Sequence, residues 1–374
     1  MDYHVDSWRG SKKLETQTGE IRQDRLMTAI MGSYPKPRYI FDRSGRELLD
    51  EVGSSFYELE REIGPAEFQE RLDRAALMAI EDQNEAGIDF MTDGEERQGH
   101  YVLYVLRKLA GIDFESLTEK SIREGRYVRR LPTVVNKIAY LQPVLVDDFV
   151  FTDQHATGIA KIGLPGPSTV VDSVADAYYG GDRERMSWDY AQAIHHEVEN
   201  LIQAGCRAIQ FDDPVLLRYP EQAQEWGLKA LQACFDGLES QATFFVHICR
   251  GYPDKPLERQ GISYKANADY YEDILRLFSE STIDVVSIEG AQSNLDLAVL
   301  PAIDRKTVML GVLDVGSNEV ESVKVLVERG REALHFLPRE QLILAPDCGM
   351  LQLSRTAAKQ KLMNLAGAAR ELNS

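Results

Sequence analysis

Eight short apolar or β-rich runs recur along this sequence, and most are separated by a segment with helical period. Strands that alternate with helices form a parallel sheet, because each helix returns the chain to the start of the next strand. Eight such units predict an α/β fold, a TIM-type (β/α)8 barrel, with a doubly wound open sheet as the weaker alternative. The runs lie at residues 26–31, 88–92, 160–164, 207–211, 243–248, 283–288, 307–313 and 341–345.

Two segments fall outside this alternation. Residues 1–25 are polar and lack a clear period, so we expect an N-terminal arm that packs on the body or on another subunit of a homo-oligomer. The stretch at about 101–158 is too long for one helix and includes a β-rich run at 141–146, which predicts an inserted hairpin subdomain. Residues 26–374 are then a single catalytic barrel that carries this insertion.

Capping signals indicate where some of the helices begin. Ser187 is expected to be the N-cap of one helix, and Asn318 with Glu321 has the spacing of a capping box. The final helix is expected at about 355–371.

Composition narrows the class of partner. The formal net charge of −18 opposes binding to nucleic acid or anionic lipid, whose phosphates require a cationic surface. No apolar run approaches the roughly 20 residues that span a bilayer, and the polar start is unlike a secretory signal. We therefore expect a cytoplasmic protein that acts on small molecules.

Four residues that can bind a metal follow the ends of three predicted strands. His247 and Cys249 end the fifth run, Glu289 ends the sixth, and Cys348 follows the eighth. Each has an ordinary explanation when taken alone, as a core histidine, a buried cysteine or a solvated glutamate. A parallel barrel would bring all four to one face, and a set of nitrogen, thiolate and carboxylate donors suits zinc.

Other strand ends would face the same mouth of the barrel. Gly32 and Ser33 follow the first run and could present backbone N–H groups and a hydroxyl to an anion, although a plain turn is the favoured explanation when they are taken alone. Acidic clusters at 93–96 and 212–213 follow the second and fourth runs. They could hold an ammonium group, and acidic helix caps are the common alternative.

From about residue 27 onward the chain resembles a short, single-barrel member of the cobalamin-independent methionine synthase family. The resemblance rests on His247-x-Cys249, Ser287-Ile288-Glu289 and Pro346-Asp347-Cys348-Gly349. It implies that His247, Cys249, Glu289 and Cys348 are the four zinc ligands.

The same resemblance implies a substrate and a reaction. Gly32, Ser33, Glu95 and Asp212 match the positions that bind the carboxylate and amine of homocysteine in that family. The expected reaction is transfer of a methyl group from a methyltetrahydrofolate-type donor to the homocysteine thiol, giving methionine. Zinc would lower the thiol pKa from roughly 8.5, so that the nucleophilic thiolate is present at neutral pH.

The sequence departs from the family pattern after the seventh strand. Gly316 stands where the family's synthases carry a histidine that helps proton transfer, and Asp314 is the nearest group that could take over this catalytic role. Alternative activities are alkyl transfer to another thiol, as in epoxide opening by coenzyme M, and demethylation with a different methyl donor. A zinc-stabilised binding or storage protein is disfavoured, because structural zinc sites are normally closed by Cys and His alone.

Overall fold

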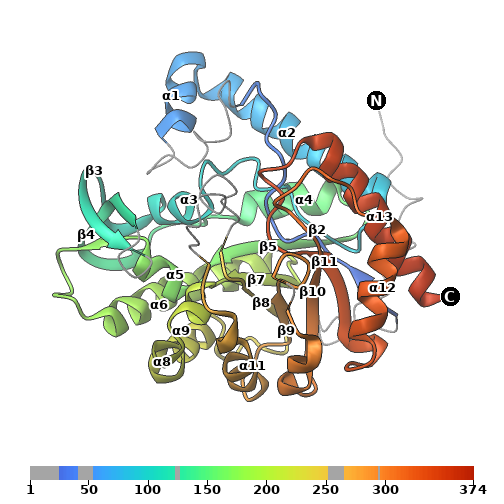
Figure 1. The fold of residues 1–374 in the computed structure, drawn as a ribbon. Coiled ribbons are helices and arrows are strands. Elements are labelled where there is room, and N and C mark those ends of the chain that lie inside the picture. Colours follow the sequence, from blue (N-terminus) through green and yellow to red (C-terminus); the bar gives the residue numbers. More distant parts are fainter. Residues whose placement is uncertain (1–24, 41–53, 123–126, 252–264, 294) are drawn as a thin grey trace.

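The computed structural model describes residues 25–40, 54–122, 127–251, 265–293 and 295–374 (Figure 1). The expected N-terminal arm, residues 1–25, lies outside the described residues except for Arg25. The division of the chain into an arm and a barrel therefore stays a prediction.

A parallel sheet of eight strands forms the centre of the molecule (Figure 1). Its strands follow the order β1-β11-β10-β9-β8-β7-β5-β2, and a parallel bridge between Ala29 and Phe90 joins the two ends of that order. The sheet is thus a nearly closed barrel, which confirms the TIM-type fold over an open sheet. Its strands are β1 Met27–Thr28, β2 Phe90–Met91, β5 Ile159–Pro165, β7 Ala208–Asp212, β8 Thr243–Ile248, β9 Val285–Ile288, β10 Thr307–Leu313 and β11 Leu342–Pro346.

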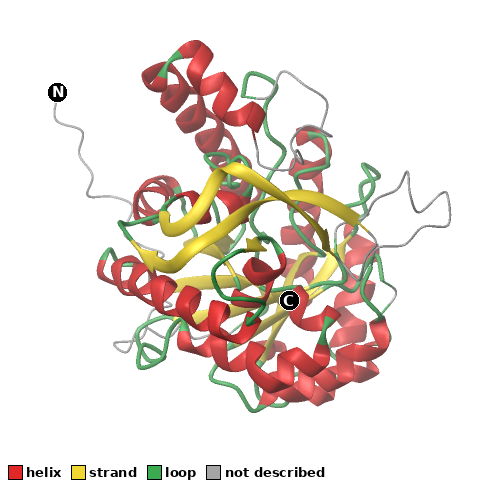
Figure 2. Cartoon of the chain, turned by 90° about the vertical axis from the view of Figure 1, so that its left-hand side faces the viewer, coloured by secondary structure: helices red, strands yellow, loops and turns green. Residues whose placement is uncertain are grey.

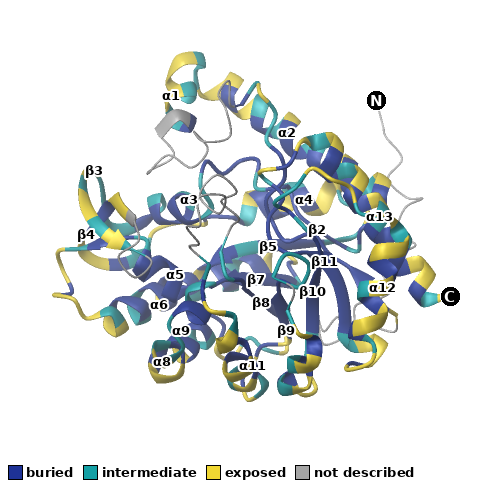
Figure 3. Cartoon of the chain, in the orientation of Figure 1, coloured by how far each residue is buried: buried dark blue, intermediate teal, exposed yellow. Residues whose placement is uncertain are grey.

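The strands read as apolar runs because both of their faces are buried. Alternate residues such as Met27, Ala29 and Met31 point into the barrel, where the ring edge of Phe90 meets Phe245 at 5.2 Å between centroids. The remaining residues pack against the surrounding helices. Figure 3 shows the central strands buried and the outer faces of the helices exposed.

Helices surround the barrel (Figure 1). None of the described helices is both long enough and apolar enough to cross a membrane. The α-helices are α1 Ser54–Ile63, α2 Pro65–Ala86, α3 Tyr101–Arg107, α4 Val146–His155, α5 Pro167–Asp172, α6 Arg183–Gln203, α7 Val215–Arg218, α8 Pro220–Gln222, α9 Leu228–Ala233, α11 Tyr271–Ser279, α12 Val323–Ala333 and α13 Arg355–Asn373. Shorter 3-10 or π segments are η2 Ala223–Gly227, η3 Ala268–Tyr270, η4 Leu297–Ile303 and η5 Arg339–Gln341.

Two expected helix starts were wrong. Helix α6 begins at Arg183, and its N-cap is Asp182, which accepts a hydrogen bond from the Arg185 N–H. Ser187 lies within that helix and donates to the Glu184 carbonyl. Helix α12 is capped by Ser322 and not by the expected box at residues 318–321.

The expected insertion is an antiparallel hairpin of two long strands, β3 Leu109–Ile122 and β4 Tyr127–Tyr140 (Figure 2). The short strand β6 Ala175–Asp176 pairs with β4 in parallel. The run at 141–146, which suggested the hairpin, is not a strand: it connects β4 to α4.

A buried glutamate anchors this connection to helix α6. Glu197 is completely buried, and its carboxylate accepts hydrogen bonds from the Val144 N–H at 2.8 Å, the Leu145 N–H at 2.6 Å and the Tyr140 hydroxyl at 3.0 Å. These bonds satisfy two backbone groups at the start of α4 that have no partner within the helix. Glu197 is therefore one of the side chains that tie the hairpin to the barrel.

We predict that Glu197→Ala lowers the free energy of unfolding by about 3 kcal/mol, because it leaves buried N–H groups without an acceptor. Urea denaturation followed by circular dichroism measures the change. Glu199→Ala removes a partly exposed glutamate from the same helix and should change stability by only a few tenths of a kcal/mol. Equal effects of the two substitutions would contradict the anchoring role of Glu197.

Candidate metal centre and active site

Three of the four expected metal ligands meet at the C-terminal ends of the strands. His247 lies on β8, Cys249 follows that strand directly, and Cys348 follows β11, the eighth strand of the barrel in the chain. The His nitrogen and the two sulfur atoms lie within 4.8 Å of one another, and all three residues are buried. The chain topology thus brings together residues that are about a hundred positions apart.

The spacing of these atoms fits a tetrahedral metal. The Cys249 and Cys348 sulfur atoms are 3.9 Å apart. Two zinc–sulfur bonds of about 2.3 Å at the tetrahedral angle require a separation of about 3.8 Å, whereas a disulfide would require about 2.05 Å. Both cysteines are free.

His247 is oriented by the neighbouring strand. Its Nδ1 lies 2.9 Å from the Ser287 hydroxyl on β9, the residue that pairs with it in the sheet. Its Nε2 is buried and has no hydrogen-bond partner among the described residues. A proton on Nδ1 that is donated to Ser287 leaves the Nε2 lone pair available, the usual arrangement of a metal-bound histidine.

Glu289 lies beside this group but is not part of it. One of its carboxylate oxygens, Oε2, is 3.5 Å from the Lys265 ammonium, and the other, Oε1, is buried without a hydrogen-bond partner. Burial, reinforced by the charge of Cys249, raises the pKa of Glu289 to about 7. An orphaned oxygen and an orphaned nitrogen next to two thiols are what a bound cation would satisfy, so the donor set fits zinc.

Two loops next to the ligands are joined by Asp347. Its carboxylate accepts hydrogen bonds from three successive backbone N–H groups, those of Gly290, Ala291 and Gln292, at 2.6–2.9 Å. Because Asp347 immediately precedes Cys348, it fixes the segment after Glu289 against the segment that carries Cys348.

The pKa values of the two thiols are shifted in opposite directions. A hydrogen bond from Cys348, together with the nearby His247, holds the pKa of the Cys249 thiol well below its usual range. The same hydrogen bond and burial raise the pKa of Cys348.

The expected anion-binding turn at Gly32 and Ser33 is fixed by hydrogen bonds to its backbone carbonyl groups, including that of the preceding Met31. The Met31 carbonyl accepts from Lys161 at 2.6 Å, the Gly32 carbonyl accepts from the Thr92 hydroxyl at 2.7 Å, and the Ser33 carbonyl accepts from the Met350 N–H at 2.8 Å. In a trans peptide the N–H points opposite to the C=O. The Gly32 N–H is therefore turned away from the contacts of the Met31 carbonyl.

Glu95 and Asp212 face one another across the same region. A Cβ atom added at Gly163 would lie 3.4 Å from Asp212 Oδ2 and 3.9 Å from Glu95 Oε1, so both carboxylates flank one point. Burial, then repulsion from Asp212, raises the pKa of Glu95 to about 8. Burial also raises the pKa of Asp212. A cation placed between these groups would favour their ionised forms.

The Glu95 carboxylate lies against the backbone at Gly32. A Cβ atom at Gly32 would lie 2.2 Å from Glu95 Oε1, so any other residue there would displace this carboxylate. Glu95 itself has a φ of 54°, after Gly94 with a φ of 75°. Left-handed backbone at a non-glycine residue is uncommon and is typical of functional sites.

The two aspartates that end β7 have different surroundings. Asp213 accepts hydrogen bonds from the Ser168 N–H and from both the N–H and the hydroxyl of Thr169. It therefore holds the first turn of α5, as the helix-cap explanation expects. Only Asp212 faces Glu95.

Asp314 is held firmly near the metal centre. Its Oδ1 accepts from the Gly316 N–H at 2.7 Å and from the Gln292 amide at 3.1 Å. Gln292 in turn accepts from Lys265, which neighbours Glu289. The contacts described for Asp314 thus reach the metal ligands only through this chain of side chains.

The sequence reasoning missed several residues that line this region. Lys161 and Lys265 are cations beside the acidic groups, and Tyr271 has a buried hydroxyl without a hydrogen-bond partner near Glu289 and Cys249. Lys161 could have been noticed, because a charged residue within an apolar strand is unusual. Lys265 and Tyr271 carry no such signal.

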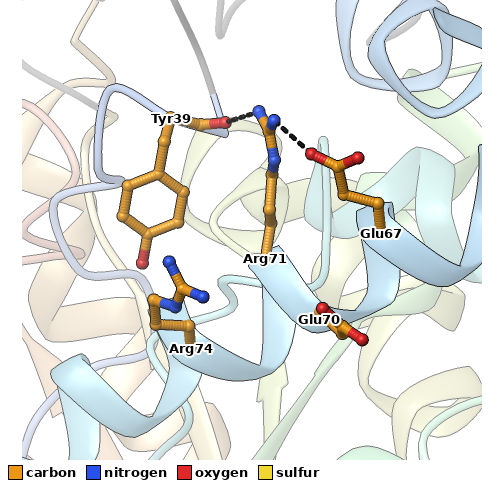
Figure 4. A pocket seen from close by; sticks show the side chains of 5 residues that line it. All are labelled: Tyr39, Glu67, Glu70, Arg71 and Arg74. Atoms are coloured by element: carbon orange, nitrogen blue, oxygen red, sulfur yellow. Dashed lines mark hydrogen bonds and ion pairs between the residues drawn. The ribbon is translucent and has the colours of Figure 1, made fainter. Parts of the chain in front are cut away.

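Two hollows on the outside of the barrel are not lined by any candidate site residue. One, of about 480 Å³, lies over helix α2, where Arg71 bonds to the Tyr39 carbonyl and to Glu67 (Figure 4). The other, of about 600 Å³, is lined by residues of helices α1 to α4. In the first hollow the central arginine is already paired within the protein.

Known proteins resemble this chain over nearly its whole length. A methionine synthase of Saccharolobus solfataricus is 28% identical over 349 residues, which cover 91% of this chain and 92% of that protein. A methionine synthase of Saccharolobus islandicus is 30% identical over 344 residues, with coverage of 91% and 92%.

A solved structure extends the similarity to three dimensions. The B12-independent methionine synthase from Shewanella sp. W3-18-1, in complex with selenomethionine, superimposes with a TM-score of 0.79 and is 29% identical. The match covers 93% of this chain and 97% of that chain. Residues 26–371 match the family described as cobalamin-independent synthase, catalytic domain. The chain therefore belongs to the cobalamin-independent methionine synthase family.

Proposed function

We propose that this protein is a zinc-dependent methyltransferase that transfers a methyl group from a methyltetrahydrofolate-type donor to the thiol of homocysteine, giving methionine. The observation that carries the proposal is the pairing of a His/Cys/Cys cluster with two facing carboxylates at one end of the barrel. Relatives called methionine synthases support the choice of reaction.

In this proposal His247, Cys249, Glu289 and Cys348 hold zinc. The metal supplies a positive charge that lowers the pKa of a bound substrate thiol, so that the thiolate is present at neutral pH. Ser287 keeps His247 in the required orientation, and Asp347 holds the loop after Glu289 next to Cys348. Lys265 offers a cationic partner to Glu289 whenever its carboxylate moves away from the metal.

The substrate's amino-acid end is bound at the other half of the site. The N–H groups of the Gly32–Ser33 turn receive the carboxylate, and Glu95 with Asp212 receives the ammonium group. Holding both charged groups fixes the position of the α-carbon, which would direct the thiol toward the residues that would hold the zinc. A thiol without these groups would bind less tightly.

Gly316 favours a second candidate, in which the same site serves another methyl or alkyl donor. The family's histidine is replaced by a residue without a side chain, and the Gly316 N–H bonds to Asp314. We propose Asp314 as the group that assists proton transfer in place of this histidine. If Asp314 does not assist proton transfer, the natural methyl or alkyl donor is one whose reaction requires no proton at this position.

We predict about one zinc ion per chain, and loss of that zinc in Cys249→Ser and in Cys348→Ser. Each substitution removes a thiolate donor but little buried apolar area, so the fold should persist. Elemental analysis measures the zinc, and circular dichroism measures the fold. Cys234→Ser alters a buried cysteine outside the cluster and should leave the zinc content unchanged. Stoichiometric zinc in both ligand variants would refute the assignment.

We predict that Asp212→Asn raises the KM for homocysteine about tenfold to a hundredfold, because it removes a charged hydrogen-bond acceptor for the ammonium group. Thiols that lack an amine should be little affected. Steady-state kinetics with both classes of thiol provides the measurement. Asp213→Asn disturbs the cap of α5 and should affect both classes alike. An equal loss for both classes in Asp212→Asn would contradict the role of Asp212.

We predict that Gly316→His raises turnover with methyltetrahydrofolate, by as much as roughly 10²–10⁴, the usual contribution of a general acid or base. The backbone of Gly316 is outside the left-handed region, so a side chain can be introduced without that strain. Single-turnover kinetics isolates the transfer step. Asp314→Asn in the native background should slow the same step. A native folate rate in the ordinary enzymatic range, with no gain in the variant, would show that the histidine is dispensable.

A further inference from the structure

Lys161 is a buried lysine that the reaction itself does not use. It lies on β5, it is completely buried, and its side chain extends into the barrel, with its ammonium 5.9 Å from the centre of the Phe245 ring. Removing an ammonium group from water is costly unless it is fully paired. Its described hydrogen bonds go to the Met31 carbonyl, at 2.6 Å, and to the side-chain oxygen of Gln210.

These two contacts determine the orientation of Gln210. An ammonium group can only donate, so Lys161 requires the oxygen of the Gln210 amide to face it. The amide nitrogen then points the other way and donates to Asp212 Oδ1 at 2.7 Å and to the Met31 carbonyl at 3.1 Å. Without the lysine, the amide of Gln210 is free to rotate and the bond to Asp212 loses its support.

The same contacts determine the orientation of the peptide between Met31 and Gly32. Its carbonyl receives two hydrogen bonds from inside the barrel, from Lys161 and Gln210. Its N–H, which belongs to Gly32, must therefore point in the opposite direction. One lysine thus governs the group proposed for the substrate carboxylate and the group proposed for the substrate ammonium.

We propose that Lys161 is a positioning residue that aligns both halves of the amino-acid binding site, Gly32 and Asp212, through the Met31 carbonyl and Gln210. This inference rests on the proposed function, because it takes an amino-acid thiol as the substrate. The charge of Lys161 also acts on both carboxylates, Glu95 and Asp212, and favours their ionised forms.

The test uses four thiols and isothermal titration calorimetry of the zinc-loaded protein. They are homocysteine, mercaptobutyrate (which lacks the amine), mercaptopropylamine (which lacks the carboxylate) and ethanethiol (which lacks both groups and the α-carbon). Lys161→Met keeps an unbranched side chain that is one atom shorter and removes its donors. We expect this substitution to weaken the binding of homocysteine about tenfold or more and to weaken the binding of both single-group analogues. The binding of ethanethiol and the zinc content should stay unchanged.

The pattern separates positioning from direct contact. Asp212→Asn should weaken only the thiols that carry an amine, whereas Lys161→Met should also weaken mercaptobutyrate, which has none. In kinetics, Lys161→Met should raise KM far more than it lowers kcat. Lys120→Met is the matched control, because Lys120 is another lysine whose ammonium donates to backbone carbonyls. Its acceptors are the carbonyls of residues 171, 172 and 174, away from the site. It should leave all four affinities unchanged.

Two outcomes overturn the proposal in different ways. If the native protein prefers homocysteine over ethanethiol and Lys161→Met keeps that preference, Lys161 has no positioning role and the proposed function stands. If the native protein shows no such preference, the amino-acid substrate is wrong and the role of Lys161 falls with it. Gln210→Leu breaks the link to Asp212 but keeps the Lys161 bond to the Met31 carbonyl. It should weaken the binding of the thiols that carry an amine more than that of mercaptobutyrate, and it tests the proposal where Lys161→Met does not fold. Unchanged binding of all four thiols would overturn the proposal as well.

Discussion

Polar side chains at the mouth of this barrel are removed from water, and each must be matched by a partner. The Asp213 carboxylate accepts hydrogen bonds from the first turn of α5, and the Asp347 carboxylate accepts them from three N–H groups of one loop. Among the described residues, His247 Nε2 and Glu289 Oε1 do not meet this requirement, and neither does the Tyr271 hydroxyl beside them. Asp213 and Asp347 are thus satisfied, whereas atoms of two proposed zinc ligands lack a partner. These two unpartnered atoms, which lie beside two thiols, support the proposed metal site independently of sequence resemblance.

The strands and the three clustered ligands were accessible from the sequence because they depend on one rule. A strand buried on both faces is an apolar run, and the residue that ends the run lies at a common edge of the sheet. Thus His247, Cys249 and Cys348 could be expected to meet. The position of the Glu289 side chain could not, because it is set by Lys265, a residue in a segment with no apolar period.

Helix starts were harder to predict, because distant partners compete for the local capping groups. Asn318 accepts from the Ser354 N–H, and Glu321 accepts from the Asp314 N–H and pairs with Lys361. Neither is left for the capping box that their spacing suggests. The run at 141–146 was misread for the same reason: two of its N–H groups bond to Glu197 on a helix rather than to a neighbouring strand.

These long-range bonds also bear on the departure from the family at Gly316. The Asp314 N–H donates to Glu321, and its carbonyl accepts from Lys361, a lysine that is itself completely buried. The backbone at the start of this loop is therefore held from two sides, while the Asp314 side chain is held by Gln292 and Gly316. A loop fixed in this way does not need the family's histidine to keep its shape. In the proposed function, the consequence of Gly316 therefore lies in the missing imidazole and in the proton that we propose it would carry.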